Sequence, residues 1–254
     1  MRFCSSILCL LLFCIANSGF VHSQTATAQI PSPFQQQAQA AVSGGKPFSV
    51  VNLTATAEWI AGSDRESGTA QLQANIDGST NVQLALGKAS RTDVQTKADS
   101  SRSCTWTDGT GKSFDVFGPN CLIAIPWFSP SLFTQSSVTL PALLASTDDG
   151  AVERDNATLH QVSYLLKLTG ANTASTNRMV SQSTVKVFYD PQTFLPTSLE
   201  YAIHPDKNNL QNISVKVAFS NYQAVSGVML PHHIERFVNR TLQLKLDVTT
   251  ASIE

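Results

Sequence analysis

The feature that most constrains the fold is an alternation of apolar and polar residues in the C-terminal third of the chain, residues 184–253. Residues 213–220 read Ile-Ser-Val-Lys-Val-Ala-Phe-Ser, and residues 242–249 repeat the pattern as Leu-Gln-Leu-Lys-Leu-Asp-Val-Thr. A period of two places successive side chains on opposite faces of a strand, so one face meets apolar matter and the other meets water. Gly227 and Pro231 interrupt the pattern between these runs. The C-terminal third is therefore predicted to be an antiparallel meander with one apolar face.

The N-terminal half carries a weaker form of the same pattern. It predicts four consecutive strands that also form a meander, over residues 52–60, 68–76, 82–86 and 89–96. Asp77-Gly78 is a strong hairpin turn between the second and third of these strands. The polar stretches 61–67 and 97–102 are predicted to be loops, and a short hairpin is expected over residues 104–117.

The middle of the chain breaks the strand pattern. Ser129 is a suitable N-cap and Pro130 suits the first helical position, so residues 129–145 are predicted to form one or two helices that Asp148-Asp149-Gly150 terminates. Strands are expected again over 151–156 and 159–168, and residues 170–183 are expected to be polar and flexible. The chain is therefore mainly β, of the α+β class.

The N-terminus has the layout of a secretory signal peptide. Arg2 precedes an almost wholly apolar run, residues 7–16, and small-residue cleavage sites follow, of which the one after Ser23 is nearest the run. We expect residues 1–23 to be removed and the protein to be periplasmic or secreted, with no transmembrane segment; an uncleaved anchor is the alternative. Residues 24–47 are expected to be a flexible segment with a short helix over 34–42, and residues 48–254 a single β domain.

Two cysteines, Cys104 and Cys121, follow the predicted signal peptide. An even pair in an exported chain predicts a disulfide bond. Two free thiols in a redox or metal site are the alternative, although the spacing is not Cys-x-x-Cys and no histidine is near in sequence.

Charge and motifs narrow the classes of function. The formal net charge is −1, from 17 basic and 18 acidic residues, with no basic stripe that would bind nucleic acid. No motif of a nucleotide-binding loop, a metalloprotease or a serine hydrolase is present. His232-His233 lies on an expected strand, where neighbours point to opposite faces, and Glu235 and Arg236 are interpreted as solvated charges. We assign no catalytic residue, metal or cofactor; an enzyme that uses His160 or His232 is the least favoured hypothesis.

One apolar cluster stands out, formed by Trp127, Phe128, Leu132 and Phe133. Its ordinary interpretation is the packing of a helix on a sheet. The functional interpretation is a lid over an apolar groove, because a long curved sheet has more apolar surface than one or two helices cover. These four residues are the predicted ligand-binding site.

Short motifs of the C-terminal third resemble the periplasmic lipoprotein carriers of the LolA and LolB type. They are the strand-turn-strand of residues 187–196 and the segments 219–222, 225–231 and 234–236, and the whole chain is also similar to a group of exported bacterial proteins. The resemblance implies an incomplete antiparallel barrel, or curved sheet, with short helices over its concave face and a lipid or acyl ligand inside. In those carriers an arginine inside the cavity latches the lid, a role that we assign to no residue of this sequence.

The favoured function is an exported, non-catalytic carrier or sensor that binds an apolar ligand, or a lipidated protein, in the concave face of a half-barrel. The alternative is an interaction module of the cell envelope whose groove is filled by its own helices. A disulfide and the resemblance are compatible with both.

Overall fold

In the computed structural model of the 254-residue chain, the structure describes residues 30–98, 101–116, 120–121, 126–135, 144–166, 174–205, 208 and 210–254. The predicted signal peptide, residues 1–23, lies outside this described part. No described helix is long and apolar enough to cross a membrane.

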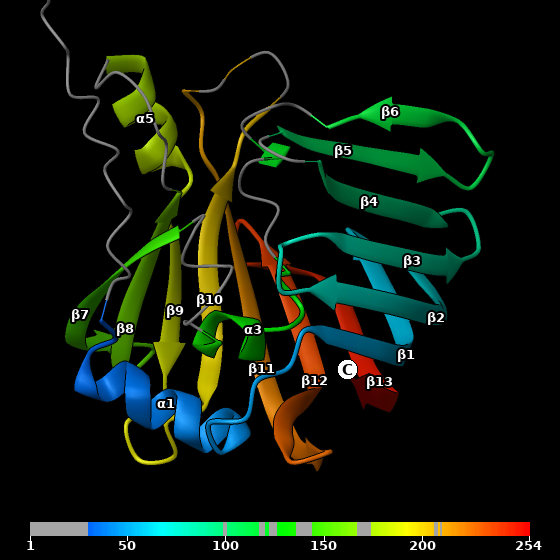
Figure 1. Ribbon diagram of the computed structural model, residues 1–254. Helices are drawn as coiled ribbons and strands as arrows, with labels where there is room; N and C mark the ends of the chain where they lie inside the picture. The colour runs from blue at the N-terminus through cyan, green and yellow to red at the C-terminus, as the bar shows by residue number, and fades with distance from the viewer. Residues whose placement is uncertain are drawn as a thin grey trace, which may run out of the picture.

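The described residues form one thirteen-stranded antiparallel sheet that curves around a concave face (Figure 1). The strand order is β6-β5-β4-β3-β2-β1-β13-β12-β11-β10-β9-β8-β7. The strands are β1 Val50–Ala61, β2 Asp64–Asn75, β3 Thr80–Leu86, β4 Arg91–Ala98, β5 Ser101–Asp108, β6 Ser113–Asp115, β7 Leu144–Arg154, β8 Ala157–Leu166, β9 Val185–Tyr189, β10 Pro196–Ile203, β11 Ile213–Val225, β12 Val228–Val238 and β13 Thr241–Ile253. No ladder joins β6 to β7 in this order, so the sheet stays open, as the predicted half-open barrel requires.

β13 divides the sheet into two wings. It pairs with β1 on one side and with β12 on the other. We call β1–β6 the N-terminal wing and β7–β12 the C-terminal wing; the strands of the two wings run in different directions in Figure 1. β6 and β7, which are consecutive strands in the chain, form the two outer edges of the sheet.

The N-terminal wing confirms the predicted meander, with two corrections. The stretch 61–67 is not a loop, because β1 and β2 continue in register to the pair Ala61–Asp64 and turn only at Gly62-Ser63. Polar residues are tolerated in this extension because they form cross-strand pairs, such as Arg65 with Glu58 at 2.8 Å. The stretch 97–102 is likewise mostly strand, since β4 extends to Ala98 and β5 begins at Ser101.

The C-terminal wing confirms the predicted strands but corrects the middle of the chain. The predicted helical region is reduced to α3, Ser131–Thr134, within its described residues, and residues 144 and 145 already belong to β7. Asp148-Asp149-Gly150 does not end a helix: it lies inside β7 at a register shift, where Gly150 has a φ of 80°. The stretch predicted to be flexible contains a helix, α5, Ala174–Gln182.

Helix α1, Pro33–Ser43, forms where the composition predicts a helix. The Ser32 side chain accepts from the backbone of Gln35, whose own side chain caps in return, and Gly44 ends the helix with a φ of 60°. α1 crosses the C-terminal wing on its concave side, and α3 lies nearer the middle of the sheet (Figure 1). Both helices therefore cover the C-terminal wing.

Candidate functional site

α3 is fixed tightly between the sheet and α1. The Ser131 hydroxyl donates to the Met229 carbonyl of β12 at 2.9 Å, and the Gln135 amide donates to the Ser43 hydroxyl at the end of α1 at 3.1 Å. The Tyr164 hydroxyl of β8 donates to the Phe133 carbonyl at 3.2 Å. The helix is thus bonded to both sides of the C-terminal wing as well as to α1.

A cavity beneath α1 and α3 is too small to hold a water molecule. It is lined by Gln35, Ala38, Phe133, Thr134, Val162, Tyr164 and Tyr189. Burial raises the pKa of Tyr164 to about 12 and that of Tyr189 well above its ordinary value, so both phenols stay neutral. This part of the concave face is a packed core and not a groove.

Three of the four predicted groove residues belong to that core. Phe128 and Leu132 are 0% exposed and Phe133 is 2% exposed. Trp127 differs, because it is only partly buried and packs edge-on against Phe128, with ring centroids 5.4 Å apart. Only Trp127 is therefore left with surface that a ligand can contact.

Trp127 lies against an arginine on the concave face. The guanidinium carbon of Arg236 is 5.4 Å from the centre of the Trp127 ring. Arg236 stands opposite Val217 on β11 and Leu244 on β13, which are 0% and 1% exposed, so its side chain shares their inward face. Its Nε is buried and has no hydrogen-bond partner. The interpretation of Arg236 as a solvated charge is therefore wrong.

Tyr201 connects Arg236 to the opposite wing. Tyr201 on β10 stands opposite the buried Val215, which places it on the same inward face. The pKa of Tyr201 is raised, mainly because the phenol is buried. Arg236 opposes this increase through its charge and a hydrogen bond, whereas the negative charge of Asp93 adds to it. Asp93 belongs to β4, so β4 and β10 face each other across the concave side. We call Asp93, Trp127, Tyr201 and Arg236 the central cluster.

The inner face of β4–β6 is polar and aromatic. Arg91 pairs with Asp93 at 2.6 Å, and its guanidinium lies 4.5 Å from the centre of the Trp106 ring. Trp106 in turn stacks on Phe114, with centroids 4.3 Å apart. All four side chains are partly exposed, so an extended amphiphilic surface continues from the central cluster along the N-terminal wing.

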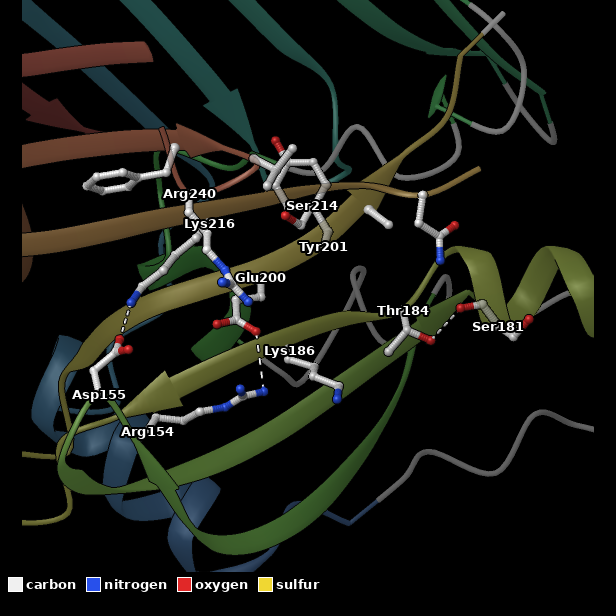
Figure 2. Close-up of a pocket in the computed structure, with 14 residues that line it drawn as sticks. Arg154, Asp155, Ser181, Thr184, Lys186, Glu200, Tyr201, Ser214, Lys216 and Arg240 are labelled. Carbon is white, nitrogen blue, oxygen red and sulfur yellow. Dashed lines mark hydrogen bonds and ion pairs between the residues drawn. The ribbon is translucent and has the colours of Figure 1, made fainter. Parts of the chain in front are cut away.

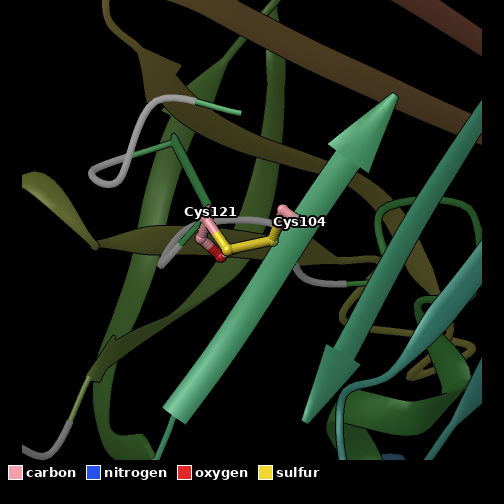
Figure 3. The surroundings of a disulfide bond; sticks show 2 residues. All are labelled: Cys104 and Cys121. Atoms are coloured by element: carbon pink, nitrogen blue, oxygen red, sulfur yellow. Dashed lines mark hydrogen bonds between the residues drawn. A yellow bond between two sulfur atoms is a disulfide. The ribbon is translucent and has the colours of Figure 1, made fainter. Parts of the chain in front are cut away.

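The predicted disulfide is present and anchors the chain that connects the two wings (Figure 3). It joins Cys104 on β5 to Cys121, and the neighbouring Asn120 makes two hydrogen bonds with the backbone of His204, of 2.7 and 2.8 Å. Because His204 follows β10, these contacts tie the outer part of the N-terminal wing to the C-terminal wing. Opposite Cys104, Gln95 is 4% exposed and both polar atoms of its amide lack a partner.

The histidines considered for catalysis have other partners. His160 stacks on Phe34 of α1 at 3.4 Å, and its Nε2 lies 2.5 Å from Asp148, which also accepts a hydrogen bond from Ser32 at 2.5 Å. Burial raises the pKa of Asp148, but the hydrogen bonds from Ser32 and His160 outweigh it and the pKa is lowered. Ser32 is the N-cap of α1 and Asp148 belongs to β7, so their hydrogen bond fixes the start of α1 on β7. Serine and histidine each contact the carboxylate, which is not the order of a catalytic triad.

His232 lies with its Nδ1 at 3.2 Å from the Leu230 carbonyl, whereas His233 contacts Asp247 at 2.6 Å. The two neighbouring histidines therefore have separate partners. No group of three or more His, Cys, Asp or Glu residues suited to a metal ion occurs among the described residues.

Sequence reasoning missed Arg236, although the signal was present. Arg236 is in phase with Ile234 and Val238, whose apolar side chains mark the inward face of the strand. The sequence does not predict that Asp93 faces inward. The apolar residue of this part of β4 is its neighbour Val94, which points outward, so the alternation suggests the opposite assignment of the two faces.

Comparison with known proteins identifies the fold. No protein-family model and no curated protein matches the sequence. Among solved structures, a domain described as an outer membrane lipoprotein-sorting protein from Vibrio parahaemolyticus superposes with a TM-score of 0.52 at 8% identity, covering 87% of this chain and 91% of that one. A DUF1329 family protein from Desulfovibrio piger gives a TM-score of 0.51 at 10% identity, with 87% and 92% covered. The fold is therefore LolA-like, as the sequence motifs predict.

Proposed function

We propose that the protein is an exported, non-catalytic carrier or sensor that binds an apolar acyl or lipid ligand on the concave face, at the central cluster. The observation that supports this best is Arg236: a partly buried guanidinium between the apolar Val217 and Leu244, with its Nε unpartnered and the Trp127 ring beside it. The LolA-like fold of the lipoprotein-sorting domain from Vibrio parahaemolyticus adds support at the level of architecture.

The chemistry of the cluster favours an amphiphile over a plain hydrocarbon. Partly exposed aromatic surface for an acyl chain is available on Trp127, Trp106 and Phe114. Such apolar contacts are not directional, so they do not fix the orientation of the chain. The Arg236 guanidinium offers a charged donor for a polar or anionic head, and such charge-assisted hydrogen bonds are strong where water is excluded. A lipidated protein would present the same acyl chemistry.

The compartment belongs to the same proposal. Residues 1–23 serve as a cleaved signal peptide, and the Cys104–Cys121 disulfide fits an oxidising compartment such as the periplasm or the exterior.

The test is native mass spectrometry of the gently purified protein, followed by titration with a fluorescent fatty acid. We expect a co-purified acyl compound and saturable uptake of the probe, weakened at least tenfold by Arg236→Gln. Arg65→Gln is the matched control, because Arg65 lies on the outer face of β2 and is well exposed. Bare protein in every preparation, together with no uptake of the probe, contradicts the proposal.

A second function is favoured by the filled space beneath α1 and α3. If the helices fill the whole concave side in the same manner, the protein is an interaction module of the cell envelope that binds another protein and no small ligand. It predicts a specific protein partner after cross-linking in cells and an unchanged thermal midpoint on addition of any fatty acid.

A further inference from the structure

A second concave site lies on the outer face of the C-terminal wing. Lys186, Glu200 and Lys216 are direct cross-strand neighbours on β9, β10 and β11. They alternate along their strands with residues such as Val187 and Leu199, which are at most 1% exposed and point to the concave core. This row therefore lies on the face of the sheet opposite the concave core; Figure 2 shows Lys186, Glu200 and Lys216 together with the other residues that line the groove.

The turn between β7 and β8 closes one side of this row. Asp155 of the turn forms an ion pair with Lys216, and Arg154 approaches Glu200 at 3.5 Å. The hairpin thereby reaches over to β10 and β11 and leaves a groove of about 930 Å³ between itself and the sheet. That volume is in the range of ligand sites and far exceeds a single water or ion.

The groove has more positive than negative charge. Its lining carries four cations, Arg154, Lys186, Lys216 and Arg240, but only two carboxylates, those of Asp155 and Glu200. Each carboxylate is already paired with one cation. Neither Lys186 nor Arg240 lies within ion-pair distance of a carboxylate among the described residues, although Lys186 stands opposite Glu200 on the neighbouring strand, so the lining keeps an excess of two positive charges.

Neutral polar groups complete the lining. The Ser181, Thr184 and Ser214 hydroxyls border the groove but already donate, to the Arg178 carbonyl, the Ser181 carbonyl and the Asn239 side chain, and the Asn212 amide adds a neutral donor. Lysine ammonium groups donate from several directions, which suits the three acceptor oxygens of a phosphate. The apolar part of the lining includes Phe237, which stands opposite Lys216 on the same face, so the remainder of a larger ligand also finds contact.

We propose that this outer groove binds a phosphate-bearing anion, with Lys186 and Arg240 as the two residues that neutralise it. A soluble phosphate ester and the head group of a phospholipid share this chemistry. The charged row and the acyl site lie on opposite faces of the sheet, although Tyr201 of the central cluster also borders the outer groove. The two sites are distinguished by their charged residues, Lys186 and Arg240 in the outer groove and Arg236 in the central cluster.

The experiment is a titration of the full protein, followed by NMR or calorimetry, with glycerol 3-phosphate and, in a second arm, with phosphatidylglycerol vesicles against phosphatidylcholine vesicles. We expect saturable binding in at least one arm, weakened at least tenfold in the double variant Lys186→Gln/Arg240→Gln. Lys245→Gln is the matched control, because Lys245 is a partly exposed lysine on the outer face of β13 that does not line the groove.

The two arms identify the source of the phosphate. Binding of glycerol 3-phosphate indicates a soluble ester, whereas binding restricted to phosphatidylglycerol vesicles indicates a lipid head group. No binding in either arm overturns the proposal, as does equal weakening by Lys245→Gln. Arg236→Gln should leave phosphate binding unchanged, so failure of the acyl site and failure of the outer groove are told apart; urea midpoints verify that every variant is folded.

Discussion

The inner faces of the two wings differ in how far their side chains are exposed. The C-terminal wing is covered by α1 and α3, and the space beneath them is too small for a water molecule. The N-terminal wing keeps Arg91, Asp93, Trp106 and Phe114 partly exposed on the same side. Within the N-terminal wing this exposure is confined to β4–β6, because inward residues of β1–β3 such as Leu53, Leu72 and Leu84 are at most 6% exposed. The packed core therefore extends from the C-terminal wing across β1–β3, and the exposed amphiphilic surface lies on β4–β6.

The largest difference between the wings should appear when matched phenylalanines are shortened. Phe133→Ala removes a side chain that is 2% exposed and leaves a cavity in a core that cannot collapse, so we expect a loss of about 3–5 kcal/mol in the free energy of unfolding. Phe114→Ala removes a partly exposed ring stacked on Trp106, and should cost no more than about 1.5 kcal/mol. Urea unfolding measures both. Equal losses would contradict the distinction between the packed core and the partly exposed surface of β4–β6.

Removal of the disulfide should loosen mainly the N-terminal wing. Cys104 and Cys121 are 17 residues apart, and opening a loop of this size costs roughly 3 kcal/mol in the chain-entropy model. The double variant Cys104→Ser/Cys121→Ser should therefore unfold at lower urea, with faster amide exchange in β4–β6 than in β8–β11. Reduction of the wild-type protein is the control and should give the same exchange pattern.

Two Tyr→Phe variants should distinguish a hydroxyl that fixes α3 on the sheet from one that contributes only to the overall free energy of unfolding. Tyr164→Phe removes the hydrogen bond to Phe133, and Tyr222→Phe removes one to Pro196, of 3.2 and 2.6 Å. Each should cost about 1–2 kcal/mol, because a buried acceptor is left unpaired. Only Tyr164→Phe should speed amide exchange in α3. The same exchange in both variants would show that Tyr164 does not fix the helix.

The smallest expected effect concerns pH and α1. The pKa of Asp148 is lowered in the folded protein, so its carboxylate form stabilises the fold above the unfolded value of about 4 and this contribution is lost as the pH falls through the lowered pKa. Asp148→Asn should lower the urea midpoint at pH 7 and give a flatter decline of that midpoint from pH 5 to pH 2. Asp64→Asn, outside this contact, should keep the wild-type slope.

The strands were predictable because the period of two is a local property. Residues 213–220 and 242–249 show it without any knowledge of their partners, and the strands β11 and β13 form there. Polar stretches that look like loops are strands where cross-strand pairs satisfy their side chains, as Glu58 and Arg65 do. A turn-like sequence also lies within a strand where a bulge accommodates it, as at Gly150. The helix α5 is polar and rich in Ser, Thr and Asn, which are weak helix formers, so its composition favours a loop.

The site was predictable only in part. The Trp127–Phe133 cluster was found because its apolar residues are contiguous, yet three of its four residues pack into the core. The role of Arg236 depends on its phase relative to Ile234 and on a ring from a distant segment. The outer groove depends on the β7–β8 turn reaching β10 and β11, a contact between residues 46 and 61 positions apart that no local pattern encodes.

The position of β13 has a consequence for synthesis in the cell. It is the last strand in chain order, yet it is the seam that joins β1 to β12. A chain that lacks residues 241–253 would hold two half-sheets, each with a long unpaired border of the kind that recruits other chains. A chain that arrests before Thr241 should therefore be prone to aggregation, whereas a chain that includes β13 closes both borders with one strand.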